Sequence, residues 1–136
     1  MPELRLHHVA VALRAIDPAL HLYRDALGGR DLGGGEEIGK GDGGWLWRQV
    51  GFPGGGRVEL LEPRGEGFLT RFLDSRGEGL HHLTFRTDDV RAAIDDVRRA
   101  GYELVDVDLD DPDWREAFLR PSGAHGTLIQ LVESSG

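Results

Sequence analysis

The sequence predicts an α+β domain made of two copies of one unit, each a strand, a helix and three further strands. A His-His pair inside an apolar segment occurs at His7-His8 and returns at His81-His82. Each copy closes with an apolar run that holds one polar residue, Glu59 in the first and Gln130 in the second. His8 and His82 are 74 residues apart, and Glu59 and Gln130 are 71 apart. A repeat this long indicates a duplicated half-domain rather than a solenoid.

The length of 136 residues fits one domain, with module one at about 4–63 and module two at about 80–133. No cysteine is present, which excludes disulfides and thiolate chemistry. The net charge of −8 argues against nucleic acid and anionic membranes as partners. No apolar run approaches the ~20 residues of a membrane span, and the first residues lack the apolar stretch of a signal peptide. We therefore expect a cytoplasmic protein.

The first module opens with alternating residues over 4–13, the pattern of a half-buried strand. Asp17 is expected to cap a helix with Pro18 at its first position, and Gly28-Gly29 end it. Three strands are expected to follow, at 45–50, at 57–61 and, weakened by its glycines, near 31–38.

The second module repeats this order, with a strand over 80–86 and a helix capped by Asp88 or Asp89. Val90, Ile94 and Val97 form an apolar stripe on that helix, which Gly101 ends. Strands are expected near 103–107, 117–119 and 127–132, and the connection 63–79 is expected to hold a short helix.

The helices determine which way the histidines point. Each helix is expected to cover the sheet face that carries Val11 in one module and Phe85 in the other, so His8 and His82 project from the opposite face. Period-2 geometry turns His7 towards the helix side, and His81 likewise. We do not count these two as ligands. His21 and His125 are expected on a helix surface and in a surface loop.

Four motifs carry a family resemblance: HHVAVAL at 7–13, VELLEP at 58–63, GEGLHHLTF at 77–85 and HGTLIQLVE at 125–133. The chain resembles the vicinal oxygen chelate superfamily, which includes glyoxalases, extradiol dioxygenases and bleomycin resistance proteins. Within it, the segments at 59–63, 77–82 and 120–126 most resemble the methylmalonyl-CoA epimerase branch.

The resemblance implies that the two βαβββ modules join into a curved eight-stranded sheet, a cup with a metal inside. The implied ligands are His8, Glu59, His82 and Gln130. This set suits a divalent ion such as Co, Ni, Mn, Zn or Fe. Relatives are commonly dimers, so a homodimer is also implied.

The resemblance also raises a question about proton transfer. The epimerase branch carries a metal-bound glutamate where this chain has Gln130, and an amide cannot accept a proton near neutral pH. Glu59 is therefore the expected catalytic base. A second base is expected in the loop 39–44, where Lys40 or Asp42 is the nearest residue.

Further residues are expected to bind substrate. Trp45, Trp47 and Gln49 share one face of a strand and offer an aromatic wall with one polar contact, or else a tryptophan packs in the core or a dimer interface. Arg86 shares the face of His82 and suits a carboxylate or phosphate. Phe118 and Arg120 complete this set.

The leading functional hypothesis is a metal-dependent isomerase or lyase, epimerase-like or glyoxalase-like, acting on an acyl-CoA or α-oxo compound. One alternative is a non-catalytic protein that binds a small molecule, as antibiotic-sequestering relatives do. An extradiol dioxygenase is a further alternative, ranked lower because the carboxylate ligand lies in the other half.

Overall fold

The computed structural model describes residues 2–38 and 42–135. They divide into two compact units, one formed by His8–His81 and the other by residues 2–7 together with 82–135. The division falls inside two strands, β1 (Arg5–Ala12) and β5 (Gly79–Arg86). None of the helices within these described residues combines the length and the apolar character needed to cross a membrane.

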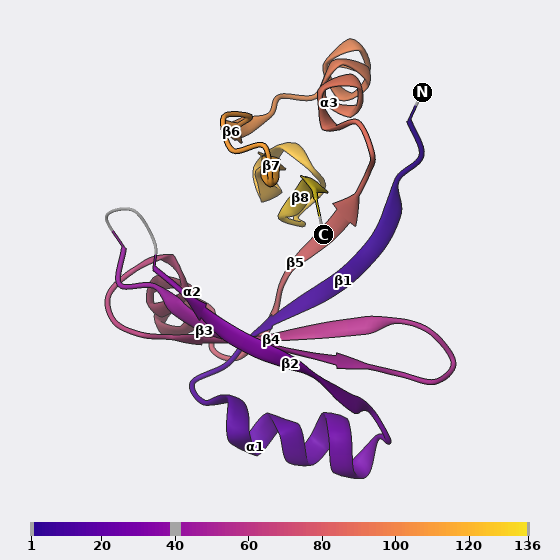
Figure 1. Cartoon of the computed structure of the whole chain (residues 1–136). Helices are drawn as coiled ribbons and strands as arrows, with labels where there is room; N and C mark the ends of the chain where they lie inside the picture. Colours follow the sequence, from indigo (N-terminus) through magenta and orange to yellow (C-terminus); the bar gives the residue numbers. More distant parts are fainter. Residues whose placement is uncertain (1, 39–41, 136) are drawn as a thin grey trace. The chain divides into compact units, whose positions relative to one another are not determined.

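The unit His8–His81 follows the predicted order of strand, helix and three strands, with one further helix at its end. After β1 come α1 (Ile16–Leu20), the π-helical η1 (His21–Ala26), β2 (Arg30–Glu37), β3 (Trp45–Gly51), β4 (Arg57–Pro63) and α2 (Phe68–Arg76). The strands lie in the order β2-β3-β4-β1, and β1 runs parallel to β4. Helices α1 and α2 lie on opposite faces of these strands (Figure 1).

Two apolar clusters fill this unit, one on each face of the strands. Val11, Leu60 and Val50 pack against Ile16 and Leu20 of α1. Ala10, Ala12 and Leu61, on the other face, pack against α2 through Leu69 and Leu73. The predicted helix layer on the Val11 face is thus confirmed, and His8 belongs to the face that α2 partly covers.

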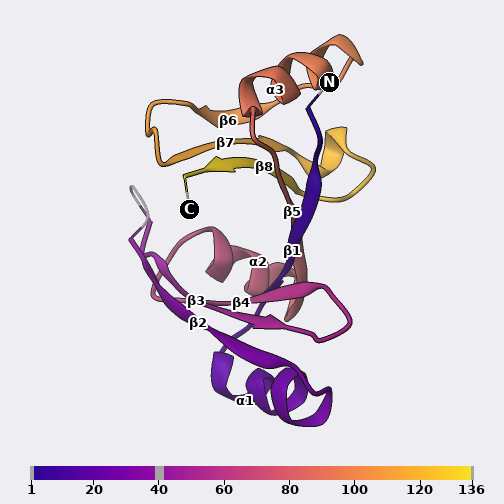
Figure 2. The ribbon, with the colours of Figure 1, turned by 45° about the vertical axis from the view of Figure 1, so that its right-hand side comes forward.

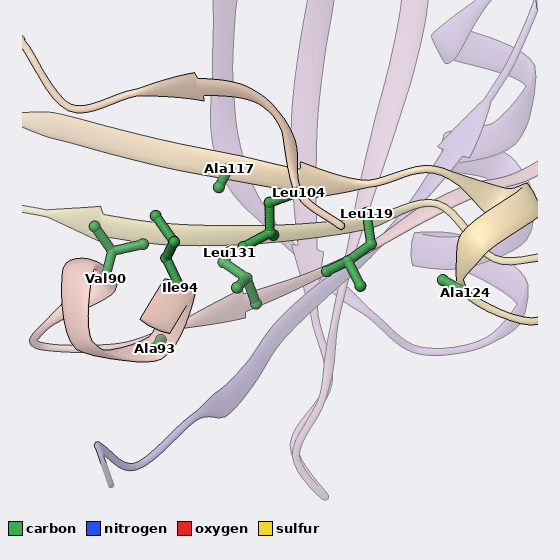
Figure 3. Packing of buried hydrophobic residues seen from close by; sticks show 8 residues of the cluster. All are labelled: Val90, Ala93, Ile94, Leu104, Ala117, Leu119, Ala124 and Leu131. Atoms are coloured by element: carbon green, nitrogen blue, oxygen red, sulfur yellow. The ribbon is translucent and has the colours of Figure 1, made fainter. Parts of the chain in front are cut away.

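The second unit repeats the pattern. After β5 come α3 (Val90–Arg99), β6 (Val105–Asp108), β7 (Trp114–Leu119), the short 3₁₀ helix η2 (Pro121–Gly123) and β8 (Ile129–Ser134). The order is β5-β8-β7-β6, with β5 parallel to β8 (Figure 2). Figure 3 shows Val90 and Ile94 of α3 beside Leu131 of β8, within a cluster that also holds Ala117 and Leu119.

The register of the parallel strands repeats between the two units. In the first, Ala10 of β1 is the partner of Glu59 in β4, and in the second, Thr84 of β5 is the partner of Gln130 in β8. The duplication inferred from the His-His pairs therefore extends to strand pairing.

The predicted cap of the first helix is wrong. The helix begins at Ile16, before Asp17, and the residue preceding it, Ala15, makes no side-chain cap. The Ile16 amide instead donates to Glu62 Oε1 at 2.8 Å, a carboxylate from β4. Asp89 does cap α3, accepting from the Ala92 amide at 3.0 Å.

The glycine-rich segment forms a full strand, β2, because its glycines allow close approach to β3. A Cβ on Gly34 would lie 2.3 Å from the Trp47 carbonyl oxygen, and one on Gly35 would lie 3.1 Å from the Trp47 ring. The register shifts between Asp31 and Gly33, where φ is +101°. The missing side chains are therefore a condition of this pairing.

Two other strand boundaries differ from the prediction. β7 begins at Trp114, three residues before the expected start, and β6 spans Val105–Asp108 where a strand was expected near 103–107. Acidic residues here lie on a short strand and its turn, where Asp110 and Asp113 amides donate to Asp108 and Asp111 side chains.

Candidate functional site

The first group of candidate residues lies on β1 and β4, on the face opposite α1. His8 is 5% exposed, and its Nε2 lies 3.6 Å from Glu59 Oε2. The parallel register accounts for this proximity, since His8 stands two residues before Ala10, the strand partner of Glu59. The structure thus brings together two side chains that are 51 residues apart in the sequence.

Gln49, the partner of Glu59 across β3 and β4, determines how that carboxylate is held. Its Nε2 donates to Glu59 Oε2 at 2.7 Å, and its Oε1 accepts from Arg57 Nη1 at 3.2 Å. A guanidinium only donates, so Arg57 fixes the amide with its oxygen outward and its nitrogen on the carboxylate. Gln49, expected to contact substrate, here positions Glu59.

Burial raises the pKa of Glu59 above its ordinary value, the hydrogen bond from Gln49 opposes this rise, and the negative charge of Glu37 adds to it. A carboxylate shifted in this direction accepts a proton more readily than an exposed one. The surroundings of Glu59 therefore suit a general base.

His8 and Glu59 also fit a shared metal ion. Their separation of 3.6 Å lies within the ~4.2 Å that two donors, each about 2.1 Å from one ion, can span. Within residues 2–38 and 42–135, no three His, Cys, Asp or Glu side chains gather as a metal centre. The amide Gln130 is one of the four expected ligands and is not of those types.

Trp45 and Trp47 share the face of Glu59 and also pack in the core of this unit. Trp47 is the strand partner of Leu61, and both Trp45 and Trp47 pack against the α2 cluster. The ring of Trp45 meets that of Phe68 edge-on, with centroids 5.2 Å apart. Both indoles remain half-buried, so each ring contributes to the core packing of this unit while part of it stays exposed.

The corresponding group in the second unit lies on β5, β7 and β8. Gln130 is buried, and its Oε1 accepts from Thr84 Oγ1 at 2.7 Å. Its Nε2 donates to Glu116 Oε1 at 2.9 Å. His82, half-buried, stands two residues before Thr84 and shares its face. Glu116 was missed because the expected strand began at 117 and left it in a loop.

The remaining expected substrate residues lie at different depths. Phe118 is half-buried and is the strand partner of Gln130. Arg86 is half-buried and donates from Nη2 to the Ser134 carbonyl at 3.2 Å. Arg120 is exposed and lies past the end of β7, where it precedes η2. The structure therefore brings Phe118 next to Gln130 but does not bring Arg120 onto that strand face.

The histidines not counted as ligands fall into two kinds. His21 and His125 are exposed. His81 packs against Phe72 and Phe68, with ring centroids at 4.9 and 5.5 Å, and burial lowers its pKa to about 4. A neutral imidazole in this aromatic setting contributes packing.

The loop expected to hold a second base gives a different result. Lys40 lies outside the described residues. Asp42 accepts from the Phe68 amide at 3.0 Å and the Gly44 amide at 3.3 Å, so its carboxylate caps α2. Glu37, which ends β2 and is the partner of Trp45, instead shares the face of Gln49 and Glu59. Sequence reasoning missed Glu37 because it placed the second base after this strand.

Known proteins give an independent comparison. Residues 7–118 match the family model of the Glyoxalase/Bleomycin resistance protein/Dioxygenase superfamily. The ethylmalonyl-CoA/methylmalonyl-CoA epimerase of Cereibacter sphaeroides is 30% identical over 134 residues, which cover 95% of this chain and 97% of that protein.

Solved structures agree in fold. The methylmalonyl-CoA epimerase from Mycobacterium tuberculosis has a TM-score of 0.80 and 32% identity, covering 96% of this chain and 88% of that one. A methylmalonyl-CoA epimerase in complex with methylmalonyl-CoA and NH4+ has a TM-score of 0.75 and 29% identity, covering 97% and 95%.

These similarities confirm the fold class, an eight-stranded mixed sheet with three helices as in the glyoxalase-like fold. They also confirm the resemblance drawn from the motifs, since the relatives named are epimerases of acyl-CoA substrates. The chain belongs to the glyoxalase/bleomycin resistance protein/dioxygenase superfamily, also called the vicinal oxygen chelate superfamily.

Proposed function

We propose that this protein is a metal-dependent isomerase that epimerises an acyl-CoA at the carbon next to the thioester carbonyl. The observation that carries the proposal is Glu59, a half-buried carboxylate that lies 3.6 Å from His8, is oriented by Gln49 and has a raised pKa. The epimerases among its relatives support the substrate class. A glyoxalase-like isomerase or lyase acting on an α-oxo compound is the second candidate, because one carboxylate shuttle suffices for it.

The proposed ligand set is His8, Glu59, His82 and Gln130. Two imidazoles, a carboxylate and an amide oxygen form a donor set suited to Co, Ni, Mn, Zn or Fe as divalent ions. When bound, such an ion would supply positive charge against the enolate that forms during proton transfer.

We propose that two glutamates transfer the proton. Glu59 accepts the proton from the carbon next to the thioester carbonyl, and the electron pair of the broken C–H bond is delocalised onto the carbonyl oxygen, which gives the enolate. Return of a proton to the opposite side of that carbon regenerates the thioester with inverted configuration. We propose Glu37 as the second proton-transfer group, because Glu37 shares the face of Glu59 and its negative charge contributes to the raised pKa of Glu59.

Solvent exchange tests the reaction. In D₂O, the protein loaded with Co²⁺ is expected to place one deuterium in methylmalonyl-CoA while interconverting its epimers, followed by NMR. Deuterium exchange no faster than with Co²⁺ alone would exclude the epimerase activity. If Co²⁺ binds but neither acyl-CoA nor α-oxo substrates react, a sequestering protein or a dioxygenase becomes the better hypothesis.

The variant Glu37→Gln separates the two proton-transfer roles. It is expected to keep exchange into one epimer and to lose interconversion at least 100-fold, within the ~10²–10⁴-fold range of general acid–base contributions. Glu36→Gln is the matched control, because Glu36 faces the other side of the same strand and lies 3.6 Å from Arg64. Equal interconversion rates in both variants would exclude Glu37.

A homodimer is part of the proposal, as is a cytoplasmic location. Light scattering of the purified protein measures the first, and a mass of one chain would contradict it.

A further inference from the structure

Both candidate half-sites contain a carboxylate and an amide joined across neighbouring antiparallel strands. In the first unit Gln49 Nε2 donates to Glu59 Oε2 at 2.7 Å, and in the second Gln130 Nε2 donates to Glu116 Oε1 at 2.9 Å. The residue at the repeat position is the carboxylate in one unit and the amide in the other. Its hydrogen-bond partner changes in the opposite sense, from the amide Gln49 to the carboxylate Glu116, so each unit contains one amide and one carboxylate.

The exchange has a consequence for Gln130, because an amide has two chemically different ends. Thr84 donates to Gln130 Oε1 through its hydroxyl. A hydroxyl can donate or accept, so Thr84 could pair equally well with the oxygen or the NH₂ end of the amide. Glu116 is a carboxylate and only accepts, so the amide NH₂ must face it. Glu116 therefore determines which end of the Gln130 side chain faces Thr84.

Glu116 is itself held in place. Its Oε1, the atom that accepts from Gln130, also accepts from Trp114 Nε1 at 2.8 Å. Both residues lie on β7, two positions apart and hence on one face of the strand. With Glu116 fixed, Gln130 Oε1 accepts one hydrogen bond from Thr84 and keeps a second lone pair.

We propose that Glu116 is a positioning residue, which orients the buried Gln130 amide so that its oxygen is presented as a metal ligand. This inference rests on the proposed function, in which Gln130 is one of four ligands. Glu116 acts through Gln130, as Gln49 acts on Glu59 in the first unit. Hydrogen-bond partners of metal ligands typically change metal affinity by ~10–100-fold when they are removed.

Metal affinity of the full-length protein tests the proposal. Metal-stripped protein is titrated with Co²⁺ against a competing chelator, and the visible Co²⁺ spectrum is recorded. Glu116→Ala is expected to weaken Co²⁺ binding ~10–100-fold. Glu116→Gln, which keeps the shape but can present either amide end to Gln130, is expected to fall between this variant and the wild type. The matched control Glu103→Gln, an exposed carboxylate of the same unit, is expected to match the wild type.

A second pair of variants separates positioning from structure. In a Gln130→Ala background, Glu116→Gln is expected to have no further effect on Co²⁺ affinity, because the group it orients is gone. In the ¹⁵N spectrum of metal-stripped protein, Glu116→Gln is expected to shift the two side-chain NH₂ signals of Gln130. A merely structural Glu116 would weaken binding equally in both backgrounds.

The outcomes distinguish this inference from the function on which it rests. Wild-type protein that binds no Co²⁺ would overturn the metal-dependent function together with the ligand role of Gln130. Wild-type binding with unchanged affinity in Glu116→Ala and Glu116→Gln would overturn the positioning role of Glu116 and leave the function standing.

Discussion

Three neighbouring strands determine the surroundings of Glu59. Glu59 lies on β4, the antiparallel neighbour β3 supplies Gln49, and the parallel neighbour β1 supplies His8. Burial raises its pKa while the Gln49 hydrogen bond limits the rise, so the group stays able to exchange a proton.

Removal of the Glu59 carboxylate should lower the rate of the reaction and leave the fold intact. Glu59→Gln keeps the shape and an oxygen donor, so we expect retained Co²⁺ binding and a kcat lower by ~10²–10⁴-fold, as for loss of a general base. Steady-state epimerisation and Co²⁺ titration measure the two quantities. Full turnover in a variant that binds the metal would refute Glu59 as the base.

His81 links stability to pH. Burial lowers its pKa to about 4 in the folded protein, while the unfolded chain takes up this proton near pH 6.5. Between these values the unfolded state binds more protons, so the free energy of unfolding falls as pH drops from about 6.5 to about 4. At ~1.4 kcal/mol per pKa unit, this residue accounts for a loss of up to about 3 kcal/mol.

Urea unfolding at pH 7 and at pH 4.5 checks this linkage. In His81→Phe, which removes the titrating group and keeps a ring against Phe72, the free energy of unfolding should depend less on pH across this window. His21→Gln removes an exposed histidine and should keep the wild-type dependence. An unchanged slope in His81→Phe would show that other groups carry the acid sensitivity.

At the scale of elements, helices α1 and α3 share one feature: the first amide of each donates to a carboxylate from a strand. Glu62 of β4 accepts from the Ile16 amide at 2.8 Å, and Glu133 of β8 accepts from the Val90 amide at 3.0 Å. Each carboxylate belongs to the last strand of its own βαβββ module and meets the first turn of its helix. A negative charge there satisfies an amide that the helix leaves without a partner and interacts favourably with the helix dipole.

This arrangement predicts a contrast between two acidic residues close to α1. Glu62→Ala should lower the free energy of unfolding by ~1–2 kcal/mol, the usual cost of losing a helix cap. Asp17→Ala should change it by less than ~0.5 kcal/mol, since Asp17 is exposed and lies inside the helix. Guanidinium denaturation measures both, and an Asp17 effect larger than that of Glu62 would contradict the structure.

Strand periodicity explains why some elements could be predicted and others not. Residues 80–86 alternate clearly, and β5 occupies Gly79–Arg86. β7 was expected only from 117 because Trp114, Arg115 and Glu116 do not alternate between apolar and polar, which concealed Glu116 as a site residue. Pairing with β8 is what assigns the residues of β7 to alternate faces, and in this register Glu116 is the strand partner of Val132.

At the scale of the whole molecule, the proposed metal binding should be coupled to folding, because the ion would bind the folded protein and not the unfolded chain. At 100 times the Kd, Co²⁺ should add ~2.7 kcal/mol to the free energy of unfolding, and the melting temperature should rise by several degrees. Calorimetry with and without a chelator measures this. His8→Ala should lose most of the rise, and a rise equal to that of the wild type would exclude His8 as a ligand.

The sequence by itself determined the duplication, the order of elements in each module and the faces of His8 and His82, because these follow from repeat spacing and the two-residue period of a strand. The family followed from motifs distributed along the chain. Each of these features is local or periodic.

Only the tertiary structure decided which side chains meet. Gln49 on Glu59, Glu116 on Gln130 and Glu62 on the Ile16 amide join residues separated by 10, 14 and 46 positions. Periodicity assigns a residue to a face, but its neighbour on that face depends on strand order and register, which the packing of the core sets. For this reason the candidate ligands could be predicted from the repeat, and the groups that hold them could not.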